Sequence, residues 1–299
     1  MMSNGPLVSI VLPTHNRATV LPRAIQSVLD QSYKRFELIV IDDGSTDDTC
    51  DVVKSFGDPR IRLLPLEKNV GSSAARNRGL QMAKGSFVAF QDSDDVWYPE
   101  KLSRDIYTLE SSHGRVGVCV CSYRHIIDDR TRVVIHPNGE VAGDEVIKRH
   151  LMGSAFSTQT LTIKKEAMDS VGGFDETLSC RQDWELCLRL AQKWSFVFVS
   201  DVLVDKWESS DSISADPFKL IDATQKIRQR HRHLFDRYPR GYSIQLYNAG
   251  KYLAFHRHHK TSMAYASRAI RMDPLNWRAY VLLAGVLTRT IPIMRRLKG

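Results

Sequence analysis

The strongest constraint on the fold is a regular alternation of strand and helix signals along the first hundred or so residues. Short apolar runs, which indicate buried strands, alternate with segments whose apolar residues recur at helical spacing. The runs lie at Leu7–Pro13, Phe36–Ile41, Arg60–Leu66 and Ser86–Gln91, and the helical segments lie at Val20–Leu29, Thr46–Phe56, Ser72–Ala83 and Pro99–Leu109. Because strand–helix–strand units join parallel strands, the pattern predicts an α/β fold with a mostly parallel sheet flanked by helices.

Polar clusters follow three of the four expected strands. They read "PTHNR" (Pro13–Arg17), "DDGSTD" (Asp42–Asp47) and "DSDD" (Asp92–Asp95). Ligands of open α/β sheets bind at the carboxyl ends of the strands. We therefore expect the three clusters to line one edge of the sheet, although they are far apart in the sequence.

The third cluster contains two carboxylates, Asp92 and Asp94, separated by one residue. Carboxylates in this arrangement can converge on one hard cation, and the bound ion can also hold phosphate oxygens. The alternative is a solvated acidic loop before the helix at Pro99. A bare D-x-D pair is common, so it is its place beside the other clusters that favours a metal site.

The second cluster is explained only in part by helix capping. Ser45 or Thr46 can cap the helix that follows. Capping does not account for Asp42 and Asp43, which precede the turn. A carboxylate at a strand end can accept a hydrogen bond from a pyrimidine N–H or a ribose hydroxyl, so these two residues are candidates for nucleoside binding.

Two helices carry further candidates. Asp183 lies at the start of an amphipathic helix, Gln182–Gln192, where it is either an N-terminal cap or a general base that removes a proton from an incoming hydroxyl. Asn77 lies in the Ser72–Ala83 helix, whose N-terminus can assist an anion. Surface solvation explains the neighbouring Arg78 better than it explains Asn77.

Beyond Arg115 the alternation weakens, and the chain becomes helical from Pro217 onward. Expected strands are Val116–Asp128, Arg130–Pro137, Ser157–Lys165, Phe196–Val199 and Val202–Trp207, with a turn at Gly172–Phe174. The helical part is interrupted near Pro239, His259 and Pro274. These changes predict two domains, 1–214 and 215–299.

The charge distribution supports this division. Residues 215–299 contain 17 Lys+Arg and 4 Asp+Glu, whereas residues 1–214 contain 25 and 30. The segment from Asn248 to Leu287 resembles part of a tetratricopeptide-type helical hairpin, and a single such unit needs a neighbour to bury its core. The chain thus combines an acidic body with a basic helical extension, and no nucleic-acid recognition motif accompanies the basic charge.

Several features predict a cytoplasmic protein. No apolar run reaches the length of a membrane-spanning helix. The N-terminus has no basic region typical of a signal peptide, and five cysteines without a C-x-x-C pair indicate reduced thiols. The apolar and basic segment Val281–Gly299 can lie on an anionic membrane surface, so peripheral contact with the inner face of the membrane is a further expectation. A buried terminal helix is the alternative.

Taken together, the motifs resemble those of the family 2 inverting glycosyltransferases, which have the GT-A fold. The resemblance covers residues 6–214 and rests on "VSIVLPTHNR", "ELIVIDDGSTDDT", "NVGSSAARNRGL", "AFQDSDDVW" and "GGFDE…QDWEL", which occur in this order. It implies transfer of a sugar from a nucleotide-diphospho-sugar, with a UDP-sugar as first choice, to a hydroxyl acceptor. A glycan or lipid-linked acceptor in surface polysaccharide synthesis is the expected partner.

The resemblance also assigns roles to residues. It implies that Asp183 is the catalytic base and that Asp92 and Asp94 hold Mg²⁺ or Mn²⁺, with Asp94 as the more direct ligand. The residues that it places at the nucleotide-sugar are Pro13, Thr14, His15, Asn16, Arg17, Asp42, Asp43, Asn77, Asp92 and Ser93.

One segment departs from the family pattern. Many relatives have an Arg-x-His segment shortly before a Ser-x-Ser, whereas Asp205–Ser214 reads "DKWESSDSIS" and contains no histidine. A third metal or diphosphate contact from this segment would have to come from Lys206 or Glu208.

Two other functions fit parts of the sequence. A nucleotidyltransferase on a similar sheet usually has a glycine-rich phosphate loop after the first strand, and "PTHNR" has no glycine. A non-catalytic interaction protein could act through its helical tail, but the complete set of Asp43, Asp92, Asp94 and Asp183 favours catalysis.

Overall fold

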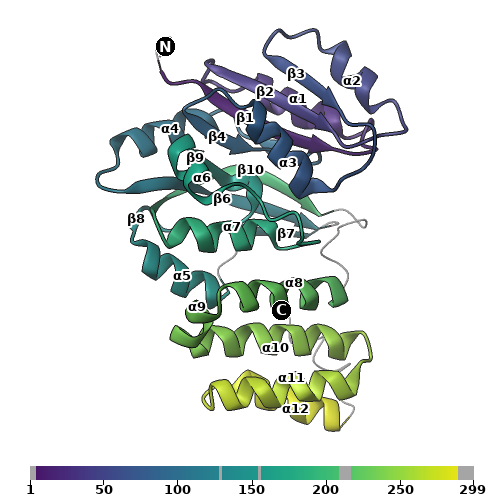
Figure 1. Cartoon of the computed structure of the whole chain (residues 1–299), viewed down its shortest axis with the longest axis vertical. Coiled ribbons are helices and arrows are strands. Elements are labelled where there is room, and N and C mark those ends of the chain that lie inside the picture. The colour runs from purple at the N-terminus through teal and green to yellow at the C-terminus, as the bar shows by residue number, and fades with distance from the viewer. Residues whose placement is uncertain (1–4, 128–129, 154–155, 209–216, 289–299) are drawn as a thin grey trace. The chain divides into compact units, whose positions relative to one another are not determined.

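The computed structural model describes residues 5–127, 130–153, 156–208 and 217–288, and it contains two compact units (Figure 1). The sheet unit comprises Met1–Val146, Phe156–Thr177 and Gln182–Ser212. The helical unit comprises Ile147–Ala155, Leu178–Arg181 and Ile213–Gly299. Each unit is described by itself below.

The sheet unit is built on one mixed sheet with the strand order β3-β2-β1-β4-β9-β6-β10-β5, in which β7 pairs with β6 and β8 pairs with β10. The strands are β1 (Val8–Thr14), β2 (Phe36–Asp42), β3 (Ile61–Pro65), β4 (Phe87–Phe90), β5 (Val96–Trp97), β6 (Val116–Ile127), β7 (Arg130–Val134), β8 (Gly139–Val141), β9 (Leu161–Lys164) and β10 (Ser195–Glu208). The β3-β2-β1-β4 pairs and the β6-β10 pair are parallel. The other pairs are antiparallel.

Helices flank this sheet, so the predicted α/β class is confirmed, with most of the parallel pairing in the N-terminal half. The helices of the sheet unit are α1 (Leu21–Leu29), α2 (Thr49–Ser55), α3 (Ser72–Met82), α4 (Lys101–Ser111), α6 (Lys165–Val171) and α7 (Gln182–Ala191), with a 3₁₀ turn η1 (Thr158–Thr160). Helix α5 (Gly143–Leu151) contains residues of both units.

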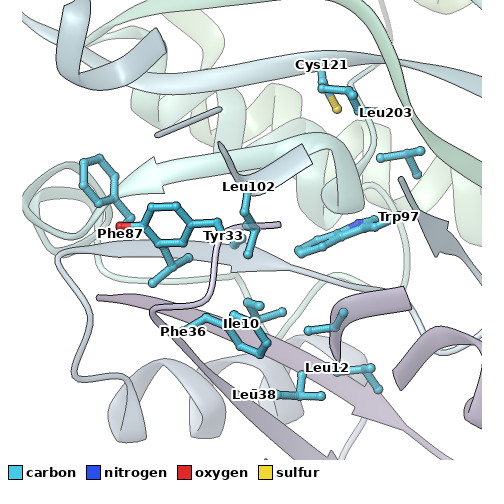
Figure 2. Packing of buried hydrophobic residues seen from close by; sticks show 14 of the residues in the cluster. Ile10, Leu12, Tyr33, Phe36, Leu38, Phe87, Trp97, Leu102, Cys121 and Leu203 are labelled. Carbon is cyan, nitrogen blue, oxygen red and sulfur yellow. The ribbon is translucent and has the colours of Figure 1, made fainter. Parts of the chain in front are cut away.

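The main core lies between the sheet and the helices that cover it (Figure 2). Ile10 and Leu12 of β1, Leu38 of β2 and Leu102 of α4 are fully buried, and Trp97 is 2% exposed. Strands β1 and β2 are buried along their whole length, which explains why they read as continuous apolar runs rather than as an alternating pattern. Burial of these strands fixes the positions of the loops at their ends.

Two expectations about strands were wrong. The strand expected at Ser157–Lys165 begins with η1, and its last residue starts α6. The strands expected at Phe196–Val199 and Val202–Trp207 are one strand, β10, whose register against β6 shifts between Val199 and Val202. The extra residues of this bulge interrupt the apolar pattern without ending the strand.

The expected cap of α2 was also wrong, because this helix begins at Thr49. The Ser45 hydroxyl donates to Asp42 instead of capping the helix. Asp47 Oδ1 accepts hydrogen bonds from the backbone N–H of Thr49, at 3.0 Å, and from its hydroxyl. These local bonds extend the loop by three residues before the helix starts.

The helical unit contains α8 (Pro217–Arg230), α9 (Arg232–Arg237), α10 (Pro239–Phe255), α11 (His259–Met272) and α12 (Trp277–Leu287). The interruptions expected near Pro239, His259 and Pro274 are confirmed by these bounds. Buried side chains such as Ala254, Ala266 and Leu282 join α10, α11 and α12 in a small apolar core. No helix in the described part of the chain is long and apolar enough to cross a membrane, and residues 289–299 of the expected membrane-binding segment lie outside the described residues.

A buried ion pair in the sheet unit gives a stability prediction. The Lys101 and Asp105 side chains are 0% exposed and 2.7 Å apart. Thr162 Oγ1 also donates to Asp105 Oδ2, at 2.7 Å. We expect Lys101→Met to lower the free energy of unfolding by about 3–5 kcal/mol, because Asp105 keeps a buried charge without its partner.

The matched control is Lys165→Met, which removes a partly exposed lysine from an ion pair of the same i,i+4 spacing with the exposed Asp169. This change should cost about 0–1 kcal/mol. Urea denaturation of both variants measures the difference. Equal, small losses for the two variants would contradict the assignment of a buried charge to Asp105.

Candidate functional site

The loops after β1, β2 and β4 lie at the same edge of the sheet. Parallel register pairs Thr14 of β1 with Asp42 of β2, and Val11 of β1 with Phe90 of β4. The carboxyl ends of these strands therefore face one side, where ligands of α/β sheets bind. The three polar clusters of the sequence follow these strands directly.

The first two loops are joined by hydrogen bonds. The Asn16 backbone N–H donates to Ser45 Oγ at 2.8 Å, and its side-chain oxygen accepts from the Thr46 N–H at 2.8 Å. The Arg17 N–H donates to Thr49 Oγ1 at 3.0 Å. Asn16 has a φ of 50°, a left-handed conformation that asparagine tolerates better than most residues. These bonds give the edge a defined shape without a ligand.

His15 lies between these loops in a defined orientation. Its Nδ1 is 2.8 Å from the Asp43 carbonyl oxygen, which can only accept, so the ring must carry a proton on Nδ1. Its Nε2 is 3.3 Å from the Asn16 side-chain amide nitrogen and acts as the acceptor. Asp43 and Asn16 thus hold the ring of His15 at the sheet edge, where the sequence predicted it to lie.

Asp42 and Asp43 are both buried and both support the loops. Asp43 accepts hydrogen bonds from the backbone N–H groups of Val70, at 2.7 Å, and Gly71, at 2.9 Å, just before α3. Asp42 accepts from the Cys50 thiol at 2.9 Å. Burial and then Asp42 raise the pKa of Cys50 to about 11. The oxygens of Asp43 retain free lone pairs for a ligand, whereas Asp42 faces α2.

Three other residues assigned to the donor have few partners. Pro13 and Thr14 are buried at the end of β1. Thr14 Oγ1 has no hydrogen-bond partner among the residues that the structure describes. Ser93 is partly exposed in the acidic loop.

The acidic loop after β4 (Asp92–Asp95) concentrates negative charge beside arginine and lysine side chains. Asp92 Oδ1 is 2.6 Å from Nη2 of Arg76, whose side chain is 9% exposed. Burial and the neighbouring charge of Asp92 raise the pKa of Asp94, although Arg17 and Lys206 act in the opposite direction. Burial and the neighbouring carboxylate thus disfavour the charged form of Asp94 more than the two cations favour it.

Asp95 has a structural role in the same loop. It is 2% exposed, and its Oδ1 accepts a 2.7 Å hydrogen bond from the Trp207 backbone N–H near the end of β10. Arg23 reinforces this link, because its Nη2 donates to the Asp94 carbonyl at 2.8 Å and its Cζ lies 4.4 Å from the Trp207 ring centroid. The acidic loop is thus attached to β10.

Lys206, the preceding residue of β10, lies among the acidic side chains. Its Nζ donates to Ser157 Oγ at 2.9 Å. Burial alone would lower the pKa of Lys206, but the carboxylates of Asp183, Asp95 and Asp92 raise it above its usual value. Lys206 is thus a cation at the place where the sequence lacks the family histidine. The side chain of Glu208, the other candidate, lies outside the described residues.

Asp183 belongs to the same electrostatic cluster. It is the second residue of α7, and its Oδ1 accepts a 2.8 Å hydrogen bond from the Trp184 N–H. Burial raises its pKa; Lys206 and Arg76 oppose this rise, and Asp92 adds to it. A carboxyl group with a raised pKa beside a charged cluster has the properties of a general base.

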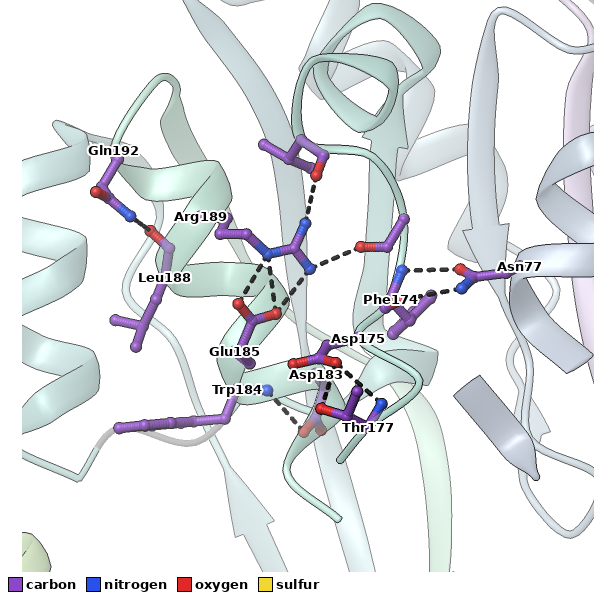
Figure 3. A network of polar contacts seen from close by, with 12 residues as sticks. Asn77, Phe174, Asp175, Thr177, Asp183, Trp184, Glu185, Leu188, Arg189 and Gln192 are labelled. Carbon is purple, nitrogen blue, oxygen red and sulfur yellow. Dashed lines mark hydrogen bonds and ion pairs between the residues drawn. The ribbon is translucent and has the colours of Figure 1, made fainter. Parts of the chain in front are cut away.

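Asn77, by contrast, uses its amide to hold a loop (Figure 3). Its Nδ2 donates to the Phe174 carbonyl at 2.9 Å and to Glu176 Oε1 at 2.7 Å, and its Oδ1 accepts from the Phe174 N–H at 2.8 Å. Gly173, at φ 85°, must be glycine here because a Cβ would lie 2.7 Å from Asn77 Oδ1. In this structure the amide thus holds the loop around Phe174, and its contact with a nucleotide stays a prediction.

Arg189 fixes the other side of the same loop (Figure 3). It pairs with Glu185 at 2.7 Å and donates to the Val171 and Gly173 carbonyls at 2.6 Å. The loop in turn places the Phe174 ring so that its centroid lies 5.1 Å from the ring centroid of Phe90 in β4 and 5.5 Å from Cζ of Arg76.

The sequence contained no signal for the roles of Arg23, Ser157 and Trp207 at this site, because their partners are far away in the chain.

The donor atoms at the edge suit a hard divalent cation. Among the described residues, no group of three or more His, Cys, Asp and Glu side chains is placed to hold a metal ion. Asp92 and Asp94 offer carboxylate oxygens, which Mg²⁺ and Mn²⁺ accept together with substrate phosphates. Burial and then the charge of Asp92 raise the pKa of Asp94, and such an ion would offset the negative charge of both carboxylates.

The family model "Glycosyl transferase family 2" matches residues 9–174 of this chain. A putative teichuronic acid biosynthesis glycosyltransferase, TuaG of Bacillus subtilis (strain 168), is 31% identical over 73% of this chain and 86% of its own length. An uncharacterized glycosyltransferase of Rickettsia prowazekii (strain Madrid E) is 31% identical over 67% of this chain, which spans 63% of that protein.

Two solved structures share the fold. S. aureus TarS 1–349 in complex with UDP-GlcNAc has a TM-score of 0.64 and 18% identity, over 95% of this chain and 88% of that chain. The mannosyltransferase PcManGT from Pyrobaculum calidifontis, in complex with GDP-Man and Mn²⁺, has a TM-score of 0.65 and 17% identity, over 96% of this chain and 81% of that chain.

Proposed function

Because the chain belongs to glycosyl transferase family 2, we propose that it transfers a sugar from a nucleotide-diphospho-sugar to an acceptor hydroxyl with inversion at the sugar. The observation that carries the proposal is that β1, β2 and β4 end at one edge of the sheet, where Asp92 forms an ion pair with Arg76. The charges of Lys206 and Asp92 also act on the pKa of Asp183, so a base is combined with a group of charges suited to a diphosphate.

The names of similar proteins support the choice of donor and pathway. A UDP-sugar is the first choice, in line with the UDP-GlcNAc complex of TarS, while the GDP-Man complex of PcManGT makes GDP-sugars the second. The name of TuaG supports a role in polysaccharide biosynthesis. A growing glycan or a lipid-linked sugar is the acceptor class that we propose.

The reaction assigns a distinct task to each end of the site. Asp183 takes the proton from the acceptor hydroxyl, whose oxygen forms a bond to the anomeric carbon. The bond between that carbon and the diphosphate oxygen breaks, and the nucleoside diphosphate leaves from the opposite face. Direct displacement inverts the anomeric carbon and requires no covalent enzyme intermediate.

The charged residues of the acidic loop and β10 act on the leaving group. Asp92 and Asp94 would hold Mg²⁺ or Mn²⁺, which when bound supplies Lewis-acid stabilisation of the diphosphate. Lys206 places a positive charge near the same carboxylates, where it stabilises negative charge on the departing phosphate. Arg76 holds Asp92 in place through the 2.6 Å ion pair.

The proposal is tested by calorimetric titration of the purified protein with UDP, GDP and dTDP, each with and without Mn²⁺. We expect UDP to bind with Mn²⁺ and to lose most of its affinity without it. The same protein is then incubated with UDP-sugars, and release of UDP is measured. Failure of all three nucleotides to bind a protein with an intact circular-dichroism spectrum would contradict a donor site.

Removal of the Lys206 charge should change the pH dependence of activity. Lys206 lowers the pKa of Asp183, so Lys206→Met should raise that pKa further. A base acts only when deprotonated, and the acid limb of kcat/KM should therefore move to higher pH. The measurement is the pH profile of UDP release, with Lys54→Met, which removes an exposed lysine, as the control. If Lys206→Met lowered the rate but left the acid limb of kcat/KM at the same pH, the charge of Lys206 would not act on the pKa of Asp183.

A further inference from the structure

The helical unit contains a pocket that the transfer reaction does not use. It lies among α8, α10 and α11, encloses about 640 Å³ of space that includes open solvent, and is lined by Gln225, Arg228, Tyr242, Tyr265 and Arg268, among others. All of these helices belong to the helical unit (Figure 1). The cavity itself has a smaller volume, about 200 Å³, which is large enough for a small anion.

Two arginines face the same aromatic ring of the pocket. Cζ of Arg228 lies 4.4 Å from the Tyr242 ring centroid, and Cζ of Arg268 lies 5.5 Å from it. The two guanidinium groups, one from α8 and one from α11, therefore both lie beside the Tyr242 ring. An anion placed near this ring would be attracted by both positive charges.

The nearby carboxylates are paired with other cations. Asp222 is 2.7 Å from Lys226, and Asp236 is 3.3 Å from Arg232. Within the described parts of the chain, Arg268 makes no ion pair or hydrogen bond, and the buried Nε of Arg228 has no hydrogen-bond partner. A buried guanidinium N–H without a partner is costly, so an acceptor supplied from outside the chain would satisfy it.

The other walls of the pocket are held by their own hydrogen bonds. Gln225 Nε2 donates to the Tyr265 hydroxyl at 2.8 Å, which leaves the hydroxyl proton able to donate to a ligand. Gln245 donates to the Leu151 carbonyl and accepts from Arg181, both at 2.9 Å. The pocket thus has a fixed shape, an aromatic face and several hydrogen-bond donors.

We propose that this pocket binds a phosphate or diphosphate group, with the guanidinium groups of Arg228 and Arg268 as its main contacts. Arginine forks match phosphate oxygens in pairs, and the Tyr265 hydroxyl supplies a further donor. The attached organic part lies against Tyr242 and Leu246, which also line the pocket. This inference does not depend on the proposed transferase activity.

The test is calorimetric titration of the full chain with inorganic pyrophosphate and with geranyl diphosphate, in EDTA so that no metal-dependent donor site contributes. We expect both probes to bind the wild type and Arg268→Gln to weaken binding at least about ten-fold, as expected for loss of a charge-assisted bidentate contact. Equal affinities indicate a free phosphate compound as ligand, and a clear preference for geranyl diphosphate indicates a lipid-linked one.

The variants are chosen to separate binding from folding. Arg268 is exposed, so its replacement should leave the melting temperature unchanged, and Arg228→Gln serves as a second variant. Arg271→Gln removes an exposed arginine from the same helix, three residues away, and should bind as the wild type does. Absence of binding to the wild type, or equal losses for Arg268→Gln and Arg271→Gln, would overturn the proposal.

Discussion

Asp183→Asn is expected to lower kcat for sugar transfer by a factor on the order of 10²–10⁴, the usual contribution of a general base. Asparagine has nearly the same shape as aspartate and can still accept the hydrogen bond from the Trp184 N–H, but it cannot take a proton from the acceptor. Affinity for UDP and Mn²⁺ should change little, because the base acts on the acceptor. Transfer assays and UDP titration on the same preparation give both values.

The pH profile gives an independent check on Asp183. Burial raises the pKa of this residue above its usual value. The base works in its deprotonated form, so kcat/KM should fall as the pH drops through the raised pKa, at a higher pH than an ordinary aspartate would require. Asp183→Asn should abolish this limb. If the variant kept the same fall in kcat/KM at low pH, the titration would belong to another group and Asp183 would not be the base.

Asp94→Ala is expected to remove the metal-dependent part of UDP binding, which amounts to an increase in Kd of at least about ten-fold with Mn²⁺ present. The alanine variant leaves Asp92 as a single carboxylate, already bound to Arg76 at 2.6 Å. Without metal, the variant and the wild type should bind UDP with similar affinity. Titrations with and without Mn²⁺ make this comparison within one experiment.

Asp95→Asn is the matched control, since it changes the adjacent carboxylate of the same loop. Burial, and then the charges of Asp92 and Asp94, raise the pKa of Asp95 well above its usual value. Asparagine can still accept the hydrogen bond from the Trp207 N–H. The control should therefore retain metal-dependent binding. If Asp94→Ala also retained it, the acidic loop would not be the metal site.

The sequence predicted best those features that depend on local periodicity. Continuous apolar runs indicated β1, β2 and β4, because strands buried on both faces need apolar residues throughout. The same runs located the loops that follow Thr14, Asp42 and Phe90, and parallel pairing then placed those loops at one edge. The helix interruptions in the C-terminal part were equally local signals.

Local signals failed where a side chain chooses between competing partners. Ser45 has the right chemistry to cap α2, yet it donates to Asp42 three residues earlier. The sequence also gave no sign that the amide of Asn77 binds Phe174 and Glu176, which lie almost a hundred residues further along the chain; its contact with a nucleotide stays a prediction. Residue type states what a group can bind but not which group is nearest.

The sequence by itself determined the class of the fold, the order of the strands and helices from β1 to β4, and the residues able to carry charge at the strand ends. Only the tertiary structure decided how that charge is arranged. Trp207 meets Asp95 across 112 residues of chain, and Lys206 lies among carboxylates from the acidic loop and α7. Coulombic interactions depend on distance in space rather than along the chain, so the pKa shifts of Asp94, Asp183 and Lys206 arise only when the sheet assembles.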